Sequence, residues 1–513
     1  MNIAHALREH AAKSPDKVLL LYEGKTMTYA GFLDQVNRLA NGLDSLGIRK
    51  DDKVGLLMTN RVEYLVSYYA IATIGAVAVP LNHAFTAYEL AYHLNDSDAV
   101  AIVSEPVLLA NVRKAQPNVP KLKSILSTSD QDELNVPTLV RNHSPERPLT
   151  ARKPEDVMHL IYTSGTTGLP KGAMITHGNI GWMVNALNRF YGEKPEDLFI
   201  AALPLFHAYG KLQTFLAAIN MGASIIVIQR FGAVEVMEAI AQYRATVFFG
   251  VPTMYTMMVN TPGMERYNLK TLRICVSGGA SLPVEILRQF EEKTGVEIAE
   301  GYGLSEVTVM THCCPVDGVK KAGSIGPVLP GLEAAVFNSD DEAVPVGTVG
   351  ELVVRGPSIM KGYYKKEEES AVALRKGWFH TGDLVKADED GYYYVVDRIK
   401  DMYIRGGRNV YPREIEEVLY TYPKVREAAV IGLPNEVYGE IGRAFIVLKE
   451  GQKADEEEVM AFLRERLARY KLPDSVHFIE ALPKNSVGKI LKRELKESIG
   501  KQGSDVTAKT DAN

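Results

Sequence analysis

The sequence predicts an α/β protein: a large N-terminal domain of αβ-layered, mostly parallel sheets with a small β-rich module, then a small mobile α+β C-terminal domain. Strand-like and helix-like segments alternate through the first three hundred residues, which is typical of parallel sheets wrapped by helices. Short strands between glycine-rich turns replace this alternation in 334–396. With 513 residues the chain is also too long for one hydrophobic core, so we expect at least two domains.

The alternating part consists of short apolar runs and longer segments with helical periodicity. A short apolar run predicts a buried strand, and apolar residues that recur every three or four positions predict a helix. The predicted strands are 54–58, 76–81, 100–103, 157–161, 225–228, 246–251, 272–276 and 296–299. The predicted helices are 61–74, 88–94, 234–243 and 283–294, and the chain begins with a charged, helical stretch.

A dense charge cluster, Asp-Arg-Ile-Lys-Asp at 397–401, follows a strand-like segment and marks a candidate domain boundary. Beyond it, the predicted helices are 414–420, 456–469 and 490–498, and the predicted strands are 428–431, 444–448 and 476–479. We therefore expect four parts, which are an N-terminal domain over 1–397, a hinge at 398–401, a mobile C-terminal domain over 402–500 and a frayed polar tail over 501–513.

The composition is that of an ordinary globular protein, with 46% hydrophobic and 24% charged residues. The net charge of −5 gives no basis for nucleic-acid binding. Only three cysteines occur, Cys275, Cys313 and Cys314, and their spacing fits neither a disulfide framework nor a zinc site, so a reducing compartment is favoured. No signal peptide is recognisable and the apolar window 68–81 is too short to span a bilayer, so we expect a cytoplasmic protein.

The most informative stretch is Tyr-Thr-Ser-Gly-Thr-Thr-Gly-Leu-Pro-Lys-Gly at 162–172. Its glycines let the backbone approach a ligand closely, its hydroxyl and N–H groups donate hydrogen bonds, and one lysine adds a cation. A solvated linker is the alternative. The stretch is not a Walker A motif, because Lys171 is followed by glycine, which disfavours a P-loop ATPase or kinase. The predicted polyphosphate-binding residues are Thr163, Ser164, Gly165, Thr166, Thr167, Gly168 and Lys171.

Two further glycine-containing turns are candidates for nucleotide contacts. The first, Gly-Tyr-Gly-Leu-Ser-Glu at 301–306, would let a flat base lie against the ring of Tyr302, and Glu306 could hold Mg²⁺. The second, Ser-Gly-Gly-Ala at 277–280, would let a purine and an acyl chain approach the backbone. A plain exposed turn explains each stretch equally well.

Three charged residues downstream are further candidates. Asp383, in Gly-Trp-Phe-His-Thr-Gly-Asp-Leu at 377–384, offers a carboxylate on a tight turn, which suits a ribose diol. Arg398 could supply the complementary donors, although a surface salt bridge explains either residue alone. Lys489 follows a glycine, so its side chain can project from a turn, but a lone lysine in a tail is usually solvated.

Taken together, these stretches occur in the order and spacing of the acyl-adenylate-forming superfamily, and the resemblance runs from about residue 10 to about residue 497. The stretches 378–384 and 397–416 most resemble the acyl-CoA synthetase branch, particularly bacterial fatty-acyl-CoA ligases. The joint match is highly specific, although no single motif is. Two departures are small: Ser305 stands where threonine is common, and 402–405 varies the segment after the hinge.

The resemblance implies a role for each candidate. Thr163 and Glu306 would coordinate Mg²⁺, while Tyr302 would stack on adenine. Lys489 would bind the substrate carboxylate and the α-phosphate, and His207 would line the access for acyl group and thiol. The remaining implied residues are Asp383 and Arg398 at the ribose, Gly279, Ala280, Gly301, Gly303 and Ser305 at the ATP site, Lys400 as the hinge, Gly406 and Gly407 for coenzyme A, and Lys211, Gly278 and Gly279 in the acyl pocket.

The reaction implied by the resemblance has two steps. A substrate carboxylate attacks the α-phosphate of ATP and pyrophosphate leaves, after which the thiol of coenzyme A attacks the acyl-adenylate. Donors fixed at the α-phosphate lower the first barrier by stabilising the charge that builds there. Because Lys489 must be inside for the first step and a pantetheine arm must enter for the second, we expect the small domain to rotate about Lys400.

Substrate choice is less determined. The segments expected to line the acyl pocket, 207–214, 248–255, 278–281 and 302–310, are largely apolar or small, which favours a medium- or long-chain fatty acid, with room for a tunnel beside Gly278. An aryl or dicarboxylic acid, or a carrier-protein thiol in place of coenzyme A, is an alternative. For Lys211 two interpretations stay open: its amine reaches solvent at the tunnel mouth, or it pairs with a second acidic group on the substrate or a phosphate of coenzyme A.

The expected partners are a small-molecule carboxylic acid, ATP and coenzyme A, with Mg²⁺ as the metal and no tightly bound prosthetic group. No nucleic acid and no transmembrane segment are expected, while transient membrane contact and a homodimer stay open. A non-catalytic protein of the same fold is disfavoured, because the loop, Glu306, Asp383, Arg398 and Lys489 are all present.

Overall fold

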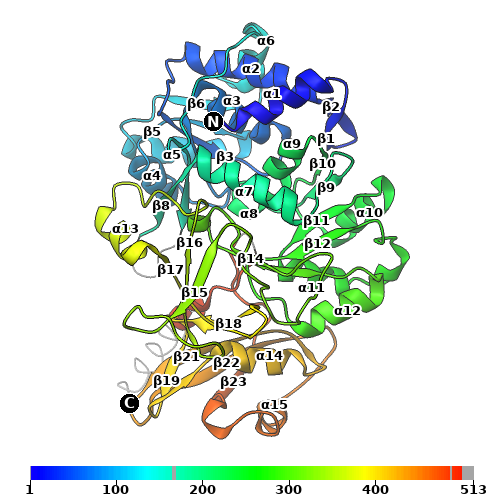
Figure 1. Cartoon of the computed structure of the whole chain (residues 1–513), viewed down its shortest axis with the longest axis vertical. Coiled ribbons are helices and arrows are strands. Elements are labelled where there is room, and N and C mark those ends of the chain that lie inside the picture. The colour runs from blue at the N-terminus through cyan, green and yellow to red at the C-terminus, as the bar shows by residue number, and fades with distance from the viewer. Residues whose placement is uncertain (1, 164–168, 486–487, 499–513) are drawn as a thin grey trace, which may run out of the picture.

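The computed structural model describes residues 2–163, 169–485 and 488–498, and within them the strands form four sheets. The N-terminal elements lie at one end of the long axis and the C-terminal unit at the other (Figure 1). The candidates Ser164, Gly165, Thr166, Thr167 and Gly168 and the tail 501–513 lie outside the described residues. The predicted α/β class, with a large N-terminal part and a smaller C-terminal unit, is confirmed.

The six-stranded sheet contains four of the predicted strands. In sheet order it consists of β6 (Ser124–Ser127), β5 (Ala99–Ser104), β3 (Lys53–Leu57), β4 (Val77–Pro80), β7 (Val157–Thr163) and β8 (Lys171–Thr176). All neighbours are parallel except β7 and β8, which form an antiparallel hairpin with Thr163 opposite Lys171. The sequence pattern does not predict β8, so the glycine-rich stretch joins two strands.

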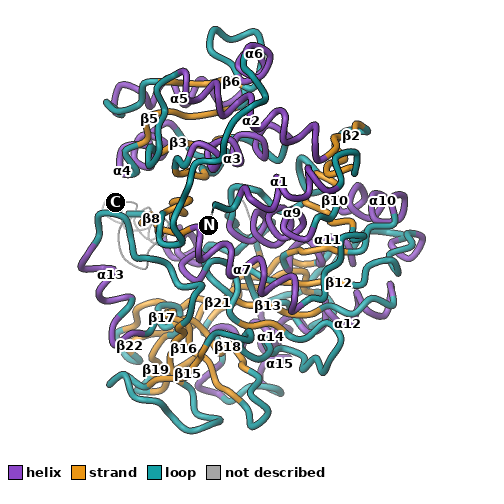
Figure 2. The backbone as a smooth tube through the Cα atoms, turned by 45° about the horizontal axis from the view of Figure 1, so that its top comes forward, coloured by secondary structure: helices purple, strands orange, loops and turns teal. Residues whose placement is uncertain are grey.

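The eight-stranded sheet lies beside the first (Figure 2) and is parallel in its centre. The strand predicted at 296–299 is wrong in position, because the backbone pairs with the preceding strand only from Ala299 onward. Gly301 and Tyr302, interpreted as a turn, therefore lie in a strand. In sheet order the strands are β14 (His312–Cys313), β13 (Ala299–Tyr302), β12 (Ile274–Ser277), β11 (Val247–Gly250), β9 (Leu198–Ala201), β10 (Ser224–Val227), β1 (Val18–Tyr22) and β2 (Lys25–Thr28).

Helix α3 (Val62–Ile74) is part of the hydrophobic core. Every residue from 64 to 74 is buried, because α3 packs against other helices on one side and against β3 and β4 on the other. Its apolar residues occur on all sides of the helix rather than in one stripe. The other helices of this part are α1 (Ala4–Lys13), α2 (Tyr29–Ser45), α4 (Ala87–Asp96), α5 (Leu109–Ala115), α6 (Val136–Asn142), α7 (His177–Phe190), α8 (Ala208–Gly210), the π-helix η3 (Lys211–Leu216), α9 (Ala217–Met221), α10 (Ala233–Tyr243), α11 (Pro252–Val259) and α12 (Val284–Thr294).

The antiparallel module predicted over 334–396 is confirmed as a four-stranded sheet, which lies between the N-terminal end and the C-terminal unit (Figure 1). It consists of β15 (Glu333–Phe337), β16 (Gly350–Arg355), β17 (Phe379–Ala387) and β18 (Tyr393–Arg398), with α13 (Glu367–Ala373) before β17. Asp383 lies within β17, so the predicted tight turn is wrong. The register shifts there and Gly382 has a φ of +72°, which is the geometry of a β-bulge.

The C-terminal unit has its own core on both faces of a five-stranded sheet. The helix predicted over 456–469 is too long, because it ends at Arg464 with its buried stripe of Val459 and Leu463. Among the described residues, no helix of the chain is both long and apolar enough to cross a bilayer. The elements are β19 (Tyr403–Arg405), β20 (Arg408–Val410), α14 (Pro412–Tyr420), β21 (Val425–Asn435), β22 (Gly439–Leu448), α15 (Glu456–Arg464), β23 (Ser475–Phe478) and a helical segment at 492–498.

Candidate functional site

The end of β7 and the short 3₁₀ helix η5 (Ser305–Val307) bring together two candidate metal ligands. Thr163 Oγ1 donates a hydrogen bond of 2.8 Å to Glu306 Oε1, and Tyr363 Oη donates to the same oxygen at 3.1 Å. Lys171 Nζ lies 5.4 Å from the centroid of the Tyr363 ring. Tyr363 belongs to no sequence motif, so only the fold reveals its position. Oxygen donors and one cation thus meet where the glycine-rich stretch begins and ends.

The backbone around Glu306 is tightly folded. A Cβ at Gly303 would lie 1.9 Å from the carbonyl oxygen of Val309, so only glycine fits there. Thr308 and Val309 have φ values of +57° and +98°, and a β-branched residue in this region is strained. A strained backbone of this kind persists only where surrounding contacts stabilise it, and such places are often functional sites. Met360 N donates to Glu306 O at 2.8 Å and so fixes the turn.

A second group of side chains surrounds Asp383. Asp383 on β17 and Arg398 on β18 are paired across the two strands, and Arg398 Nε lies 3.1 Å from Asp383 Oδ1. Tyr302 Oη donates to Asp383 Oδ2 at 2.5 Å. Burial and the Asp383 carboxylate raise the pKa of Tyr302 well above its usual value. The structure therefore places the three residues expected at adenine and ribose in direct contact.

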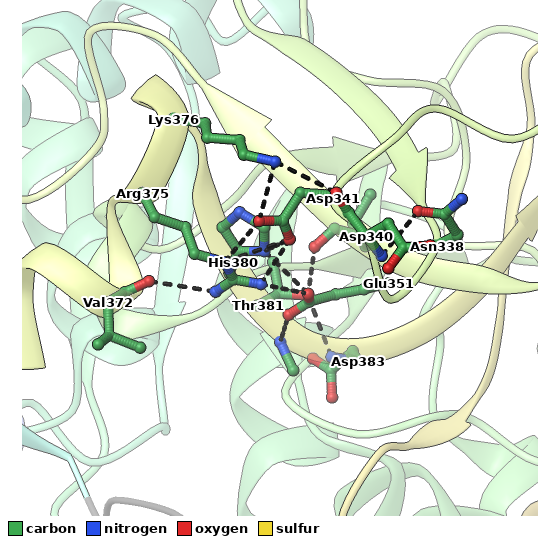
Figure 3. A network of polar contacts seen from close by, with 12 residues as sticks. Asn338, Asp340, Asp341, Glu351, Val372, Arg375, Lys376, His380, Thr381 and Asp383 are labelled. Atoms are coloured by element: carbon green, nitrogen blue, oxygen red, sulfur yellow. Dashed lines mark hydrogen bonds and ion pairs between the residues drawn. The ribbon is translucent and has the colours of Figure 1, made fainter.

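The bulge that presents Asp383 is held by the polar network of Figure 3. Glu351 Oε1 accepts from Gly382 N at 2.9 Å, and Glu351 Oε2 contacts His380 Nδ1 at 2.8 Å. Thr381 Oγ1 accepts from Asp383 N at 3.1 Å and donates to the carbonyl oxygen of Leu352 at 2.7 Å. No motif in the sequence signals Glu351. The outer members of the network include Asp341, Arg375 and Lys376.

Lys489 comes to this group from the C-terminal unit. A Cβ at Gly488 would lie 2.3 Å from Thr253 Oγ1, so Gly488 packs directly against α11. Burial and, to a smaller extent, the charge of Arg398 lower the pKa of Lys489 to about 7, against the opposing effect of Asp383. Residues distant in the sequence thus share one electrostatic environment.

His207 caps the N-terminus of α8, where its Nδ1 accepts from Tyr209 N at 3.3 Å. The side chain is half-buried. Burial lowers its pKa to about 4, with smaller contributions from the charges of Lys211 and Lys489. The imidazole is therefore neutral near pH 7 and lies within electrostatic reach of both lysines.

The expected acyl pocket is more closely packed than the sequence suggests. A Cβ at Gly278 would lie 3.2 Å from Cζ and Oη of Tyr209. Tyr209 Oη donates to the carbonyl oxygen of Gly250 at 3.2 Å, which anchors the ring. The ring of Tyr209 therefore occupies the room that we expected beside Gly278.

Lys211 opens the π-helix η3, all of whose residues are buried. The side chain is 0% exposed, and burial lowers its pKa to about 7. The interpretation that its amine reaches solvent is therefore wrong, because the π-helix lies wholly inside the core.

The remaining candidates occupy different positions. Gly279 and Ala280 are exposed after β12, Gly301 packs against Cys313, and Ser305 begins η5. Lys400 directly follows β18. Gly406 and Gly407 form an exposed turn between β19 and β20, with Gly406 N donating to Tyr438 O at 2.8 Å. The structure thus brings Lys489 to the site, while the glycine turn contacts its own unit.

Comparison with known proteins identifies two matching families. The AMP-binding enzyme family matches residues 7–364, and the AMP-binding enzyme C-terminal domain matches residues 414–489. The chain is 37% identical to a long-chain-fatty-acid–CoA ligase of Bacillus subtilis (strain 168), over 96% of this chain and 93% of that protein. It is 38% identical to a feruloyl-CoA synthase of an Amycolatopsis species, over 96% and 97%.

Among solved structures, ATP-bound MatB from Rhodopseudomonas palustris superposes with a TM-score of 0.91 at 32% identity, covering 97% of this chain and 99% of MatB. Apo MatB, with the same coverage and identity, superposes with a TM-score of only 0.79. Since the two share one sequence, the difference lies in conformation. This structure resembles the ATP-bound form more closely.

Proposed function

The chain belongs to the AMP-binding enzyme family and is an acid–thiol ligase, and from this premise we propose that it joins a medium- or long-chain fatty acid to coenzyme A through an acyl-adenylate. The observation that carries the proposal is the position of Lys489 beside the Asp383–Arg398 pair. That position puts the Lys489 amine within electrostatic reach of the candidate nucleotide residues, as the first half-reaction requires. The products would be acyl-CoA, AMP and pyrophosphate.

In the first half-reaction, Asp383 would accept hydrogen bonds from the ribose, Tyr302 would lie against adenine and Arg398 would hold the Asp383 carboxylate in place. Lys489 would bind the substrate carboxylate and the α-phosphate oxygens. The carboxylate oxygen forms a bond to the α-phosphorus while the bond to the bridging oxygen breaks, and pyrophosphate leaves with that electron pair. Lys489 would stabilise the negative charge that accumulates on the α-phosphate.

Thr163 and Glu306 fit Mg²⁺, because their oxygens are 2.8 Å apart and hard oxygen donors are the ligands that Mg²⁺ prefers. No cluster of three or more His, Cys, Asp or Glu that could hold a metal occurs within 2–163, 169–485 and 488–498. A site with few protein ligands suits Mg²⁺ that arrives with a nucleotide, since phosphates and waters complete its shell. The ion would offset charge on the polyphosphate.

In the second half-reaction the thiol of coenzyme A would replace AMP on the acyl carbon. Lys489 would have to leave, and rotation of the C-terminal unit about Lys400 would remove it and present Gly406 and Gly407 to the incoming arm. His207, neutral near pH 7, would line the access for acyl group and thiol. We further propose that the reaction takes place in the cytoplasm.

The test is a pyrophosphate-release assay with purified protein and ATP across fatty, aryl and dicarboxylic acids, with and without coenzyme A. We expect acid-dependent release without coenzyme A, AMP as the nucleotide product, and thioester only when coenzyme A is added. ADP as the product would contradict adenylation. Acid-dependent pyrophosphate without consumption of coenzyme A would instead favour a carrier-protein thiol.

A further inference from the structure

Lys211 is a buried lysine for which the structure offers no partner. Its Nζ has no hydrogen-bond acceptor among the described residues, and its side chain is 0% exposed. Its nearest aromatic neighbour is Tyr68, whose ring centroid lies 5.0 Å from Nζ. A ring face attracts a cation but accepts none of the three N–H bonds in the manner of an oxygen. Buried lysines are almost always paired, so this amine requires an explanation.

A second buried nitrogen without a partner among the described residues belongs to His159, which contacts the hydroxyl of Tyr68. Tyr68 Oη and His159 Nδ1 are 3.0 Å apart, which leaves His159 Nε2 as the free end of the ring. That atom also has no partner among the described residues, and His159 is 0% exposed. Burial and the charge of Lys211 lower the pKa of His159, so its imidazole is neutral. Two buried nitrogens without a hydrogen-bond partner among the described residues therefore lie near one tyrosine.

Two elements connect this cluster to the candidate site. His159 is on β7, the strand that ends at Thr163, and Lys211 follows His207 by one helical turn, or about 5 Å along the helix axis. The backbone bond from Lys211 N to His207 O, at 3.1 Å, places the two residues in register. An acyl chain that passes His207 would therefore reach the surroundings of Lys211 next.

The backbone at Lys211 is also unusual. Residues Lys211–Leu216 form a π-helix between α8 and α9, and π-helical insertions are rare and concentrate at functional sites. An apolar residue at this position would pack without the penalty of burying an amine. Both observations favour a functional reason for the lysine over a structural one.

We propose that Lys211 receives a hydrogen-bond-accepting oxygen at the far end of the acyl substrate, so that the enzyme selects acids with a second oxygen function remote from the reacting carboxyl. His159 Nε2 would share in binding that oxygen. The inference rests on the proposed ligase reaction and narrows its acid, because a fatty acid that ends in a plain methyl group would be the weaker substrate. Two sources supply the same chemistry: a second carboxylate, as in a dicarboxylic acid, or a terminal or phenolic hydroxyl.

The experiment compares matched acids in the pyrophosphate-release assay. One series keeps the chain length and changes the far end from methyl to hydroxyl to carboxylate, and a second pairs cinnamate with 4-hydroxycinnamate. For the wild-type protein we expect kcat/KM to favour an oxygenated member of a series. In Lys211→Met the oxygenated-to-plain ratio should fall at least tenfold, while kcat/KM for the plain acid changes less than threefold.

The results with the two acid types and the two variants distinguish a second carboxylate from a hydroxyl as the group that Lys211 binds. A wild-type preference for the dicarboxylic acid that is lost in both Lys211→Met and Lys211→Gln identifies an anionic partner. A preference for the hydroxyl acid that Lys211→Gln keeps in part identifies a neutral one, because the amide still donates. Lys211→Gln also serves as the second variant if Lys211→Met does not fold.

The control is Ser67→Ala, which removes a buried hydroxyl next to Tyr68 on α3 and should leave every ratio unchanged. Equal ratios in the wild-type and both Lys211 variants would overturn the inference while leaving the ligase activity intact. Absence of acid-dependent pyrophosphate release with any acid would overturn the proposed function, and the inference with it.

Discussion

Lys489 and Lys211 both have a pKa lowered to about 7, yet their surroundings differ in kind. Lys489 lies among charged groups: besides burial, Arg398 and Lys400 contribute to the lowering of its pKa, while Asp383 opposes it. For Lys211, burial is the whole cause. One amine is therefore part of a balanced set of charges, and the other is isolated in the core.

The two lysines also differ in how firmly they are held. Lys489 is half-buried, and the neighbouring Gly488 packs against Thr253 of α11, which belongs to the other part of the chain. If the C-terminal unit rotates, this amine returns to water and regains an ordinary pKa. Lys211 is enclosed by α3, β7 and the π-helix within one core and stays desolvated in either arrangement. The first suits a charge that arrives for one step, and the second a fixed recognition element.

The largest effect that tests this contrast is on the half-reactions. We expect Lys489→Ala to slow adenylation by about a thousandfold or more, because the positive charge at the α-phosphate is lost. Attack of coenzyme A on a preformed acyl-adenylate should change less than about threefold, since the proposed rotation would have removed Lys489 from the site by then. Single-turnover assays of each half-reaction measure the two effects.

The matched control is Lys484→Ala, which removes the same charge from the same loop. Lys484 is paired with Glu427 of its own unit at 2.6 Å. Adenylation in this variant should stay within about threefold of the wild type. Equal loss of both half-reactions in Lys489→Ala would contradict the two-arrangement interpretation.

The second prediction concerns stability and belongs to Lys211. Its pKa is about 7 in the folded protein against 10.5 for the free side chain, so between these values the unfolded chain binds more protons. The stability of the wild type should therefore rise with pH across this window. Lys211→Met removes the cost of burying the amine, which is on the order of a few kcal/mol at about pH 7 and approaches zero near pH 10.5.

Thermal unfolding at about pH 7 and about pH 10 checks this prediction, with the gain of Lys211→Met expected to be several degrees at the lower pH and small at the higher. Lys114→Met on the exposed face of α5 is the control and should show no pH-dependent gain. A loss of stability in Lys211→Met at the lower pH would mean that Lys211 is paired in solution.

The contrast between the lysines also explains what sequence reasoning could find. The sheet classes were predictable, because alternation and composition are local properties of the chain. The position of β13 was not, since hydrogen bonding to β12 decides it. Asp383 was interpreted as a turn residue from its glycine neighbour, whereas the glycine forms a bulge inside β17.

For the site, motifs identified the candidate nucleotide-binding residues, and the fold brings Thr163 to Glu306 and Asp383 to Arg398. Residues that act through long-range contacts carry no motif and were missed. These are Tyr363, Glu351, Tyr68 and His159. The burial of Lys211 was equally unpredictable, because it depends on how the π-helix packs in the core and not on a local sequence pattern.

A smaller effect on adenylation is expected from Asp383, the carboxylate that lies near Lys489 and has no counterpart near Lys211 among the described residues. Asp383→Asn keeps the shape of the side chain but leaves Arg398 without its ion-pair partner. We expect KM for ATP to rise about 10- to 100-fold, because the ribose loses a charged acceptor. Since Asp383 raises the pKa of Lys489, the pH above which adenylation declines should also move down.

The pH dependence of kcat/KM for adenylation measures this shift, with Asp388→Asn as the control, because Asp388 forms its ion pair with Lys321 at the surface. The decisive comparison is between the pH profile of adenylation, which Asp383→Asn should shift, and the pH profile of stability, which it should not. The stability profile assigned to Lys211 should be the same in Asp383→Asn, since no charged group sets its pKa. A change in both profiles would mean that the two environments are coupled.

The smallest expected effect is at Glu306, which extends the charged surroundings of Lys489 toward the phosphates. Burial lowers the pKa of Arg398, but Asp383 and more weakly Glu306 raise it, and the net shift is upward. Glu306→Gln keeps an oxygen that accepts from Thr163 and removes one charge. We expect the Mg²⁺ concentration for half-maximal adenylation to rise about tenfold, because phosphates and waters supply the other ligands. Titration of free Mg²⁺ at saturating ATP measures it, with Glu285→Gln as the surface control; an unchanged midpoint would remove Glu306 from the metal site.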